Sequence, residues 1–340
     1  MTLSAGLTSG RYFLPWLEVM SAQGATAENL LHGTGLEPKQ FGNNPPYLSQ
    51  LQLEKLFSNA NAVTGNRLLG LDLGLNLNFA AHGPLGYAGL TARNVREALG
   101  QMIRYLPLVT GLITIEKHED ERQQKCHSYV TAQPGVAPLT ERMLIQTVLC
   151  SVYIMTRFLL GNDAVVEINW SQPPDEDIAS RLESPTTHVA FNRLRNSICI
   201  PLSSLDTTMV LADEQARLQA IHACEEEMQR LEKQTSLSSR IYSMLLTQPA
   251  RAPSIDEIAE QYYLSTRTIH RRLQEEGACF RDILNASRMT LAKQYLCRDK
   301  MSVTETAYRL GYGDSANFTR AFKRSEGLTP SAYVNKLNTD

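Results

Sequence analysis

The sequence lacks the patterns that mark most hydrolases, nucleotidases and metalloproteins. It contains no GxSxG, no GxxxxGK[ST] and no HExxH, which argues against a serine hydrolase, a P-loop enzyme and a zinc peptidase. The six cysteines form no CxxC pair. Cys126 with His127 and His222 with Cys224 have no second pair of ligands at a metal-binding spacing. We therefore predict no catalytic residue, no metal site and no cofactor.

The sequence also lacks a secretion signal and an uninterrupted membrane span. Its start, MTLSAGLTSGR, has no charged stretch followed by an apolar run. The most apolar segment, Met143–Leu160, is interrupted by polar residues such as Gln146 and Arg157, whereas a membrane helix needs about 20 mostly apolar residues. We therefore predict a buried amphipathic helix there. The cysteines lie mostly among apolar residues, as free thiols in a reducing compartment do. We expect a cytoplasmic protein with no membrane contact.

Charge is distributed unevenly along the 340 residues, although the net charge is only −2. From Thr235 to Asp340 there are 15 Lys and Arg against 11 Asp and Glu, a net of +4. The remainder carries 18 basic and 24 acidic residues, a net of −6. A basic C-terminal third on an acidic body suggests an anionic partner for that third.

The first two thirds of the chain show mixed periodicities. Helical spacing of apolar residues alternates with short β-branched stretches such as Leu112–Ile115, His127–Thr131 and Ala164–Trp170. The glycine-rich stretch Ala81–Gly89 is predicted to be a loop. We predict an α+β fold, with a mixed N-terminal domain over residues 1–205 that senses a ligand. His82, Tyr87 and Arg93 flank the glycine-rich stretch and are the candidate effector-binding residues.

A long amphipathic helix is predicted between the body and the basic third. Leu211, Leu218, Ile221 and Met228 fall on one helical face. This face either packs against the body or forms the seam of a homodimer, since its spacing suits a two-helix contact. The long helix and the polar stretch at 233–239 that follows it together define a connecting segment, predicted over residues 206–238. The remaining segment, 239–340, is predicted to be all helical.

Two helix-turn-helix units are predicted in this last segment. In the first, Ser254 caps a short helix with acidic residues in its first turn, and Ser265 caps a second helix, STRTIHRRLQEE. In the second, Ser302 and Glu305 have capping-box spacing and Gly311 ends the helix. Asp314 or Ser315 is predicted to cap the next helix, DSANFTRAFKRSEG, in which Phe318 and Phe322, four residues apart, are predicted to point inward. A helix over about 280–297 joins them and spans roughly 27 Å. The two units therefore suit successive major grooves of double-stranded DNA, about 34 Å apart.

At these residues the sequence resembles the AraC/XylS family of bacterial transcription regulators. The resemblance covers about Ser254–Tyr333 and is most specific from Leu310–Gly311–Tyr312 to Thr329–Pro330. Tyr263 departs from the family pattern, which commonly has glycine in the first turn. A left-handed tyrosine there is strained, so a slightly reshaped first turn is expected. The resemblance places the DNA contacts on two recognition helices, at Arg267, Thr268, His270, Arg271, Ser315, Asn317, Thr319, Arg320 and Lys323.

The body resembles, more loosely, the regulatory domain of ornithine-utilisation regulators, through Gly83–Leu99 and His188–Asp206. The resemblance implies a dimeric, DNA-binding activator that acts through RNA polymerase and responds to a small-molecule effector. One alternative is a regulator controlled by a protein partner or by its abundance alone. Another is an enzyme fused to a DNA-binding domain, for which the sequence offers no reactive constellation.

Overall fold

The computed structural model describes residues 6–42, 45–234, 236–247 and 252–337, which form two compact units. The N-terminal unit comprises Gly6–Ala132 and Val136–Glu232, and the C-terminal unit begins at Lys233. Residues 1–5, 43–44, 248–251 and 338–340, together with Thr235 of the predicted connecting segment, lie outside the described residues.

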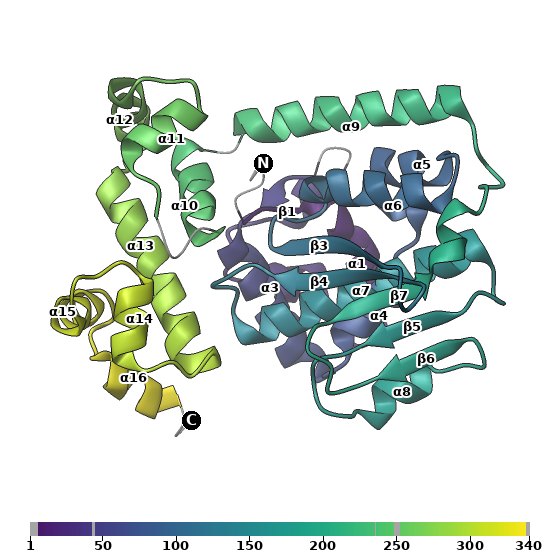
Figure 1. Cartoon of the computed structure of the whole chain (residues 1–340), viewed down its shortest axis with the longest axis horizontal. Coiled ribbons are helices and arrows are strands. Elements are labelled where there is room, and N and C mark those ends of the chain that lie inside the picture. The colour runs from purple at the N-terminus through teal and green to yellow at the C-terminus, as the bar shows by residue number, and fades with distance from the viewer. Residues whose placement is uncertain (1–5, 43–44, 235, 248–251, 338–340) are drawn as a thin grey trace. The chain divides into compact units, whose positions relative to one another are not determined.

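A five-stranded sheet organises the N-terminal unit, so the α+β class is confirmed. Its strand order is β3-β4-β7-β5-β6, and every pairing is antiparallel except β5 with β6 (Figure 1). Along β4, Cys126, Ser128 and Val130 are buried while the alternate residues are more exposed, as expected when one face of a sheet covers a core. The strands are β3 Ile113–Asp120, β4 Lys125–Ala132, β5 Val166–Asn169, β6 Thr187–Ala190 and β7 Ser197–Pro201.

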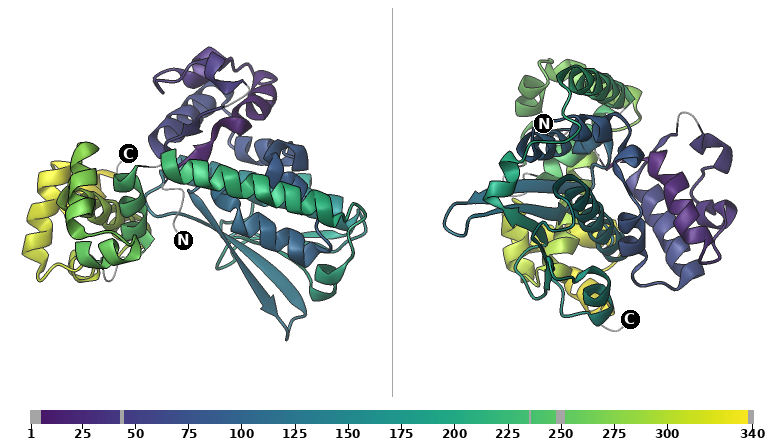
Figure 2. Two further views of the ribbon diagram at one scale, coloured as in Figure 1. Left: turned by 90° about the horizontal axis from the view of Figure 1, so that it is seen from above. Right: turned by 90° about the vertical axis from the view of Figure 1, so that its right-hand side faces the viewer.

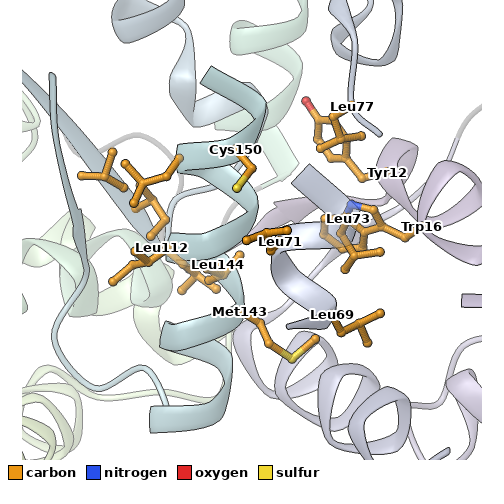
Figure 3. Close-up of a cluster of buried hydrophobic side chains, with 14 of the residues drawn as sticks. Tyr12, Trp16, Leu69, Leu71, Leu73, Leu77, Leu112, Met143, Leu144 and Cys150 are labelled. Atoms are coloured by element: carbon orange, nitrogen blue, oxygen red, sulfur yellow. The ribbon is translucent and has the colours of Figure 1, made fainter. Parts of the chain in front are cut away.

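Helices supply the rest of this unit, and α7 (Pro138–Leu160) packs against the buried face of the sheet. Leu144 of α7 lies close to Leu71 of α4 in the core, and Trp16 lies nearer to Leu73 (Figure 3). A two-stranded sheet joins β1 (Thr8–Ser9) to β2 (Tyr47–Leu48). The other helices are α1 Phe13–Ser21, α2 Ala27–Leu31, α3 Gln50–Thr64, α4 Leu69–Leu75, α5 Pro84–Leu90, α6 Val95–Arg104, α8 Glu176–Leu182 and α9 Glu214–Gln234.

Helix α7 contains the apolar segment that we expected to be a buried helix, and this is confirmed. Among the described residues it alone is long and apolar enough to cross a membrane. However, 56% of its apolar stretch is buried inside the structure. Even Gln146, Thr147 and Ser151 are buried. Burial of polar as well as apolar positions is typical of a helix at the centre of a globular core.

The predicted loop at Ala81–Gly89 is wrong, because residues Pro84–Leu90 form helix α5. Gly86 is required for a different reason from the turn that the sequence suggests. A Cβ atom at Gly86 would lie 1.8 Å from the carbonyl oxygen of Phe79. The glycine therefore lets the helix approach the preceding backbone closely. A contact of this kind leaves no mark on the local pattern that distinguishes it from a turn.

The long helix predicted after the body is α9, which runs alongside α5 and α6 (Figures 1 and 2). Cys224 and Leu231 are buried in a cluster with Leu85 of α5, and Ile221 and Met228 pack against the same cluster. In its second half, the apolar face of the helix thus packs against the body, which was one of the two predicted alternatives. In the first half, Leu218 remains 53% exposed. The predicted place of Leu211 on this helix is wrong, because α9 begins at Glu214 and Leu211, 55% exposed, lies in the turn before it.

The C-terminal unit is all helical within its described residues, as predicted. The two helix-turn-helix units are α11 with α12 and α14 with α15, and each has its own hydrophobic core. Helices α10 and α13 contribute to both cores and join them. The bounds are α10 Leu237–Thr247, α11 Ile255–Gln261, α12 Thr266–Glu275, α13 Phe280–Lys293 with a π-helical turn at Gln294–Arg298, α14 Val303–Arg309, α15 Ser315–Glu326 and α16 Pro330–Leu337.

Candidate functional site

The first candidate DNA-contacting helix is α12, whose start is fixed by a side-chain cap. Ser265 accepts a hydrogen bond from the Thr268 backbone N–H at 3.1 Å, which confirms the predicted cap. Ile269 and Leu273 are buried against α11 and α10. This leaves Arg267, His270 and Arg271 exposed and Thr268 half-buried. In this structure Arg271 Nη1 pairs with Glu275 one turn later at 2.6 Å.

The second candidate helix, α15, is anchored by aromatic side chains. Phe318 and Phe322 are fully buried, with ring centroids 5.7 Å apart, and Phe322 also meets Tyr333 of α16 edge-on. Asp314 caps the helix through the Asn317 backbone N–H at 2.6 Å. The predicted contact residues Asn317, Arg320 and Lys323 are exposed, and Ser315 and Thr319 are half-buried. The structure thus gathers the predicted contacts of each unit on the helix face away from its core.

The two units have the same turn despite their different residues. In the second, Gly311 has φ +77°, and its N–H and that of the next residue donate to the carbonyls of Tyr308 and Ala307. In the first, Tyr263 has φ +52°, with equivalent bonds to the carbonyls of Glu260 and Ala259. The expected reshaping of the first turn is therefore wrong. The left-handed geometry is kept, and the tyrosine adopts a conformation that favours glycine.

Replacing Tyr263 by glycine should raise the stability of the C-terminal unit by about 1 kcal/mol. The left-handed conformation costs a non-glycine residue about 1–2 kcal/mol, of which the greater freedom of unfolded glycine offsets part. No packing is lost, because Tyr263 is 96% exposed. Hydrogen exchange of amides in 255–275 of the full chain measures the change. Tyr308→Gly is the matched control, because Tyr308 is also exposed, at 62%, but lies within α14. This substitution should destabilise the unit, since glycine disfavours a helix interior. Faster amide exchange in Tyr263→Gly than in the wild type would show that the left-handed conformation of Tyr263 does not destabilise the protein.

The N-terminal unit contains an interior cavity of about 100 Å³ between α6, α7 and the sheet. Most of the side chains that line it are aliphatic or aromatic, including Trp16, Phe79, Leu99, Met102, Val148 and Ile198. Among the described residues that line it, none is Asp, Glu, Lys or Arg. Interior apolar cavities with a few placed polar groups are the usual form of small-molecule sites.

His82 is the predicted effector residue that lines this cavity, and it is 4% exposed. Its Nδ1 lies 2.9 Å from the Tyr12 hydroxyl and its Nε2 lies 3.3 Å from the Ser151 hydroxyl. Burial, and secondarily the charge of Arg11, lowers the pKa of His82 to about 4. The ring is therefore neutral near pH 7, with one nitrogen donating a hydrogen bond and the other accepting one.

A polar connection leads from this histidine to helix α9. Arg11 donates from Nη1 to the His82 carbonyl at 2.9 Å and from Nη2 to Glu227 Oε1 at 2.6 Å. Tyr47 donates to the same carboxylate oxygen at 3.2 Å. The side chains of Arg11 and Glu227 are 23% and 15% exposed, so solvent screens this pair less than a surface pair.

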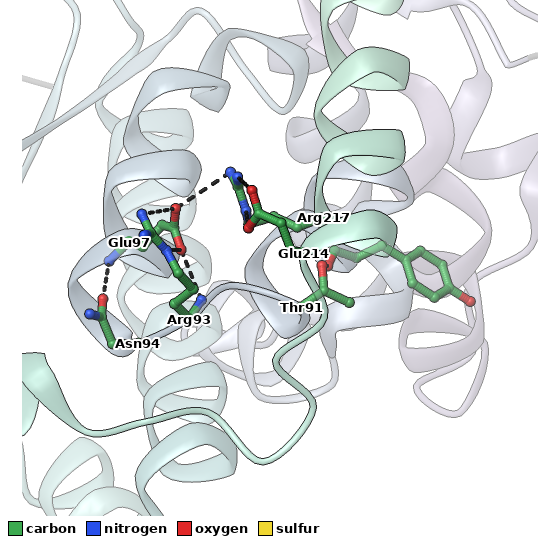
Figure 4. A network of polar contacts seen from close by, with 7 residues as sticks. Thr91, Arg93, Asn94, Glu97, Glu214 and Arg217 are labelled. Carbon is green, nitrogen blue, oxygen red and sulfur yellow. Dashed lines mark hydrogen bonds and ion pairs between the residues drawn. The ribbon is translucent and has the colours of Figure 1, made fainter.

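The other two predicted effector residues lie elsewhere. Tyr87 is 61% exposed and does not line the cavity. Arg93 pairs with Glu97, which also pairs with Arg217 of α9 at 3.4 Å, and Arg217 in turn pairs with Glu214 (Figure 4). This network fastens α6 to the start of α9. The structure therefore does not bring His82, Tyr87 and Arg93 together.

Sequence reasoning missed Tyr12, Trp16, Ser151 and Arg11. They come from α1, α7 and the turn before α1, and Arg11 and Glu227 are 216 positions apart in sequence. No local pattern connects such positions. The nearest signal was the interruption of the apolar segment in α7 by small polar residues, one of which is Ser151.

Comparison with known families identifies both parts of the chain. Residues 24–209 match the arabinose-binding N-terminal domain of AraC transcription regulators, and residues 258–336 match a helix-turn-helix domain. The ornithine utilization regulator of Pseudomonas aeruginosa is 26% identical over 334 residues, which cover 98% of each chain. The HTH-type transcriptional activator RhaS of Escherichia coli is 41% identical over 76 residues, 22% of this chain and 27% of its own.

Among solved structures, that of the transcriptional regulator CdpR from Pseudomonas aeruginosa covers 96% of this chain and 98% of its own, with 22% identity and a TM-score of 0.49. Both domain matches and the relatives are those of transcription regulators rather than enzymes. The alternative of an enzyme fused to a DNA-binding domain is therefore set aside. This chain belongs to the AraC family of DNA-binding transcription regulators.

Proposed function

We propose that the protein is a ligand-responsive transcription activator, in which a small effector held in the interior cavity controls DNA binding by the C-terminal unit. One observation carries the proposal. The cavity residue His82 is joined through Arg11 to Glu227 of α9, and the end of α9 leads into the C-terminal unit along the chain. A ligand that interacts differently with two arrangements of this connection shifts their populations and so alters operator affinity.

Replacing Glu227 by glutamine should uncouple effector binding from DNA binding. The variant keeps the size of the side chain but removes the charge that holds Arg11. The starting point is a metabolite that saturably raises the melting temperature of the full-length protein. In the wild type it should change operator affinity by about 5- to 150-fold, the usual range of allosteric coupling. In Glu227→Gln it should still bind, but the change should fall to near onefold.

Glu226→Gln is the matched control, because the neighbouring Glu226 side chain is 59% exposed and faces His222 instead. Fluorescence anisotropy of labelled operator, with and without the metabolite, measures the coupling. Equal coupling in both variants would contradict the role of Arg11 and Glu227. If no metabolite binds, control by a protein partner or by abundance becomes the better account.

The DNA contacts proposed here are those predicted from the sequence, on α12 and α15. They are supported by exposure of the basic side chains Arg267, Arg271, Arg320 and Lys323 on the faces opposite the two helical cores. Arginine can bind guanine O6 and N7 bidentately, and lysine contributes through phosphates. Bound at a promoter in the cytoplasm, the protein would aid recruitment of RNA polymerase.

We further propose that the functional segments are 1–205 for sensing, 206–238 for connection and dimerisation, and 239–340 for DNA binding. The homodimer contact would use Leu211 and Leu218, which stay exposed although apolar, near the start of α9. Leu218→Glu should weaken dimerisation by about tenfold or more, since a charge is costly in the core of an interface. Sedimentation of the full chain over a concentration series measures this. An unchanged dissociation constant would place the dimer contact elsewhere.

A further inference from the structure

The interior cavity lacks the groups that a charged effector would need. Free amino acids carry an ammonium and a carboxylate at neutral pH, and each must be paired when it is buried. None of the described lining residues is acidic or basic at neutral pH, since His82 is neutral there. The nearby guanidinium of Arg11 already binds Glu227 and the His82 carbonyl. The cavity therefore disfavours an amino acid.

Its hydroxyl groups are largely satisfied within the protein, which disfavours a sugar. Thr147 donates to the Gly70 carbonyl at 3.0 Å and Thr156 donates to the Val152 carbonyl at 2.8 Å. Thr8 and Thr110 bond to each other at 2.8 Å. A sugar presents several hydroxyl groups, each of which loses bonds to water on entry. Too few partners remain among the lining residues to replace those bonds.

One polar group does remain available. The chain Tyr12–His82–Ser151 carries three protons, one on each hydroxyl and one on the neutral ring, but forms only two hydrogen bonds. Whichever tautomer is present, one hydroxyl proton at an end of this chain has no acceptor within it. This proton makes the group a donor, so an acceptor is the complementary feature of a ligand.

We propose that the effector is a compact, neutral, largely apolar molecule that carries an oxygen acceptor, rather than an amino acid or a sugar. The size restricts the effector to a compact molecule, because the cavity measures about 100 Å³, which is smaller than the apolar cavity of about 150 Å³ that holds benzene in another protein. The inference rests on the proposed function, since it assumes that this cavity holds the effector. It differs from what the names of the matched domain and of the ornithine utilization regulator suggest for those proteins.

Tryptophan fluorescence of the full-length protein tests the ligand class directly. The chain has two tryptophans; Trp16 lines the cavity and Trp170 does not. The probes are benzyl alcohol, toluene, L-arabinose and L-ornithine. Benzyl alcohol should give a saturable signal that persists in Trp170→Phe and disappears in Trp16→Phe. Each affinity is first corrected for the partition of the probe between water and cyclohexane. After this correction, the affinity of benzyl alcohol should exceed that of toluene by about two- to tenfold, because benzyl alcohol forms one additional hydrogen bond.

A cavity-filling variant locates the probe independently. Ala98 of α6 lines the cavity and is 1% exposed, so Ala98→Leu should occupy the space and reduce benzyl alcohol affinity at least tenfold. Its melting temperature without probe shows whether the fold is kept, and Val148→Leu provides a second filled variant. Unchanged affinity in a folded filled variant would overturn the proposed binding site.

The remaining outcomes separate this inference from the proposed function. If L-ornithine or L-arabinose gives the Trp16 signal and benzyl alcohol does not, the ligand class is overturned while effector control stands. If benzyl alcohol binds in the cavity but leaves operator affinity unchanged, the cavity chemistry holds and effector control by this class fails. If no probe gives a saturable Trp16 signal, the cavity is not a site for compact apolar ligands, and the inference fails.

Discussion

Replacing Phe318 by alanine should lower the free energy of unfolding of the C-terminal unit by about 3–5 kcal/mol. Phe318 is fully buried at the centre of the second helix-turn-helix core. Its ring lies 5.5 Å from that of Tyr312 and 5.7 Å from that of Phe322, between centroids. Truncation removes these contacts and leaves a cavity. Because domains are marginally stable, the loss should also abolish most sequence-specific DNA binding.

The change is measured by hydrogen exchange of amides in 303–326 and by chemical denaturation of the full chain. Phe158→Ala is the control, because Phe158 is 65% exposed at the end of α7 and its truncation should cost no more than about 1 kcal/mol. The core assignment would be wrong if both variants lost equal and small amounts of stability. It would also be wrong if Phe318→Ala kept full operator affinity.

Lowering the pH should destabilise the N-terminal unit through His82, by about 3 kcal/mol between pH 6.5 and pH 4. Burial lowers the pKa of His82 in the folded state to about 4, from 6.5. Over this window the unfolded chain binds the proton and the folded chain does not, so protonation favours unfolding. The stability due to the neutral ring is fully present above pH 6.5 and declines as the pH falls toward 4. Carboxylates with lowered pKa values, such as Glu97, add to the loss at the acidic end.

His82→Gln isolates the histidine contribution, since glutamine keeps hydrogen-bonding capacity but does not titrate. The difference in unfolding free energy between the wild type and this variant should narrow by about 3 kcal/mol from pH 7 to pH 4. His32→Gln removes an exposed histidine and should leave the wild-type pH profile in place. Denaturation curves at several pH values measure all three. Parallel profiles for the wild type and His82→Gln would show that His82 is not held neutral by burial.

Sequence reasoning was most successful where local chemistry decides the structure. The predicted cap at Ser254 and the predicted capping box at Ser302 both form, and Asp314 and Ser265 cap the two candidate DNA-contacting helices. A cap depends on residues three positions apart, so the sequence alone contains it. The inward positions of Phe318 and Phe322 follow equally from helical periodicity. The resemblance to AraC regulators added the family, which the domain matches confirm.

It was least successful where distant residues decide. Gly86 was read as a turn residue, although its role is to let α5 approach Phe79. Strand β6, Thr187–Ala190, was missed because four residues that pair at a sheet edge carry almost no periodic signal. Tyr263 was expected to reshape its turn, yet the surrounding hydrogen bonds impose the left-handed conformation. The cavity was beyond prediction, since its lining is drawn from residues between Thr8 and Ile200.

The central claim, that the two helix-turn-helix units read one DNA duplex together, is tested most directly by selecting bound sequences from a random duplex pool. The selection is made at low salt with the purified full-length protein and, in parallel, with its Arg267→Ala variant. The account predicts two short enriched motifs about one helical turn apart. In Arg267→Ala the sequence preference within one motif should weaken while the other motif persists. The binding free energy at the affected base pair should fall by about 1–3 kcal/mol. A single enriched motif, or two motifs unaffected by Arg267→Ala, would contradict the claim that both helix-turn-helix units read the DNA.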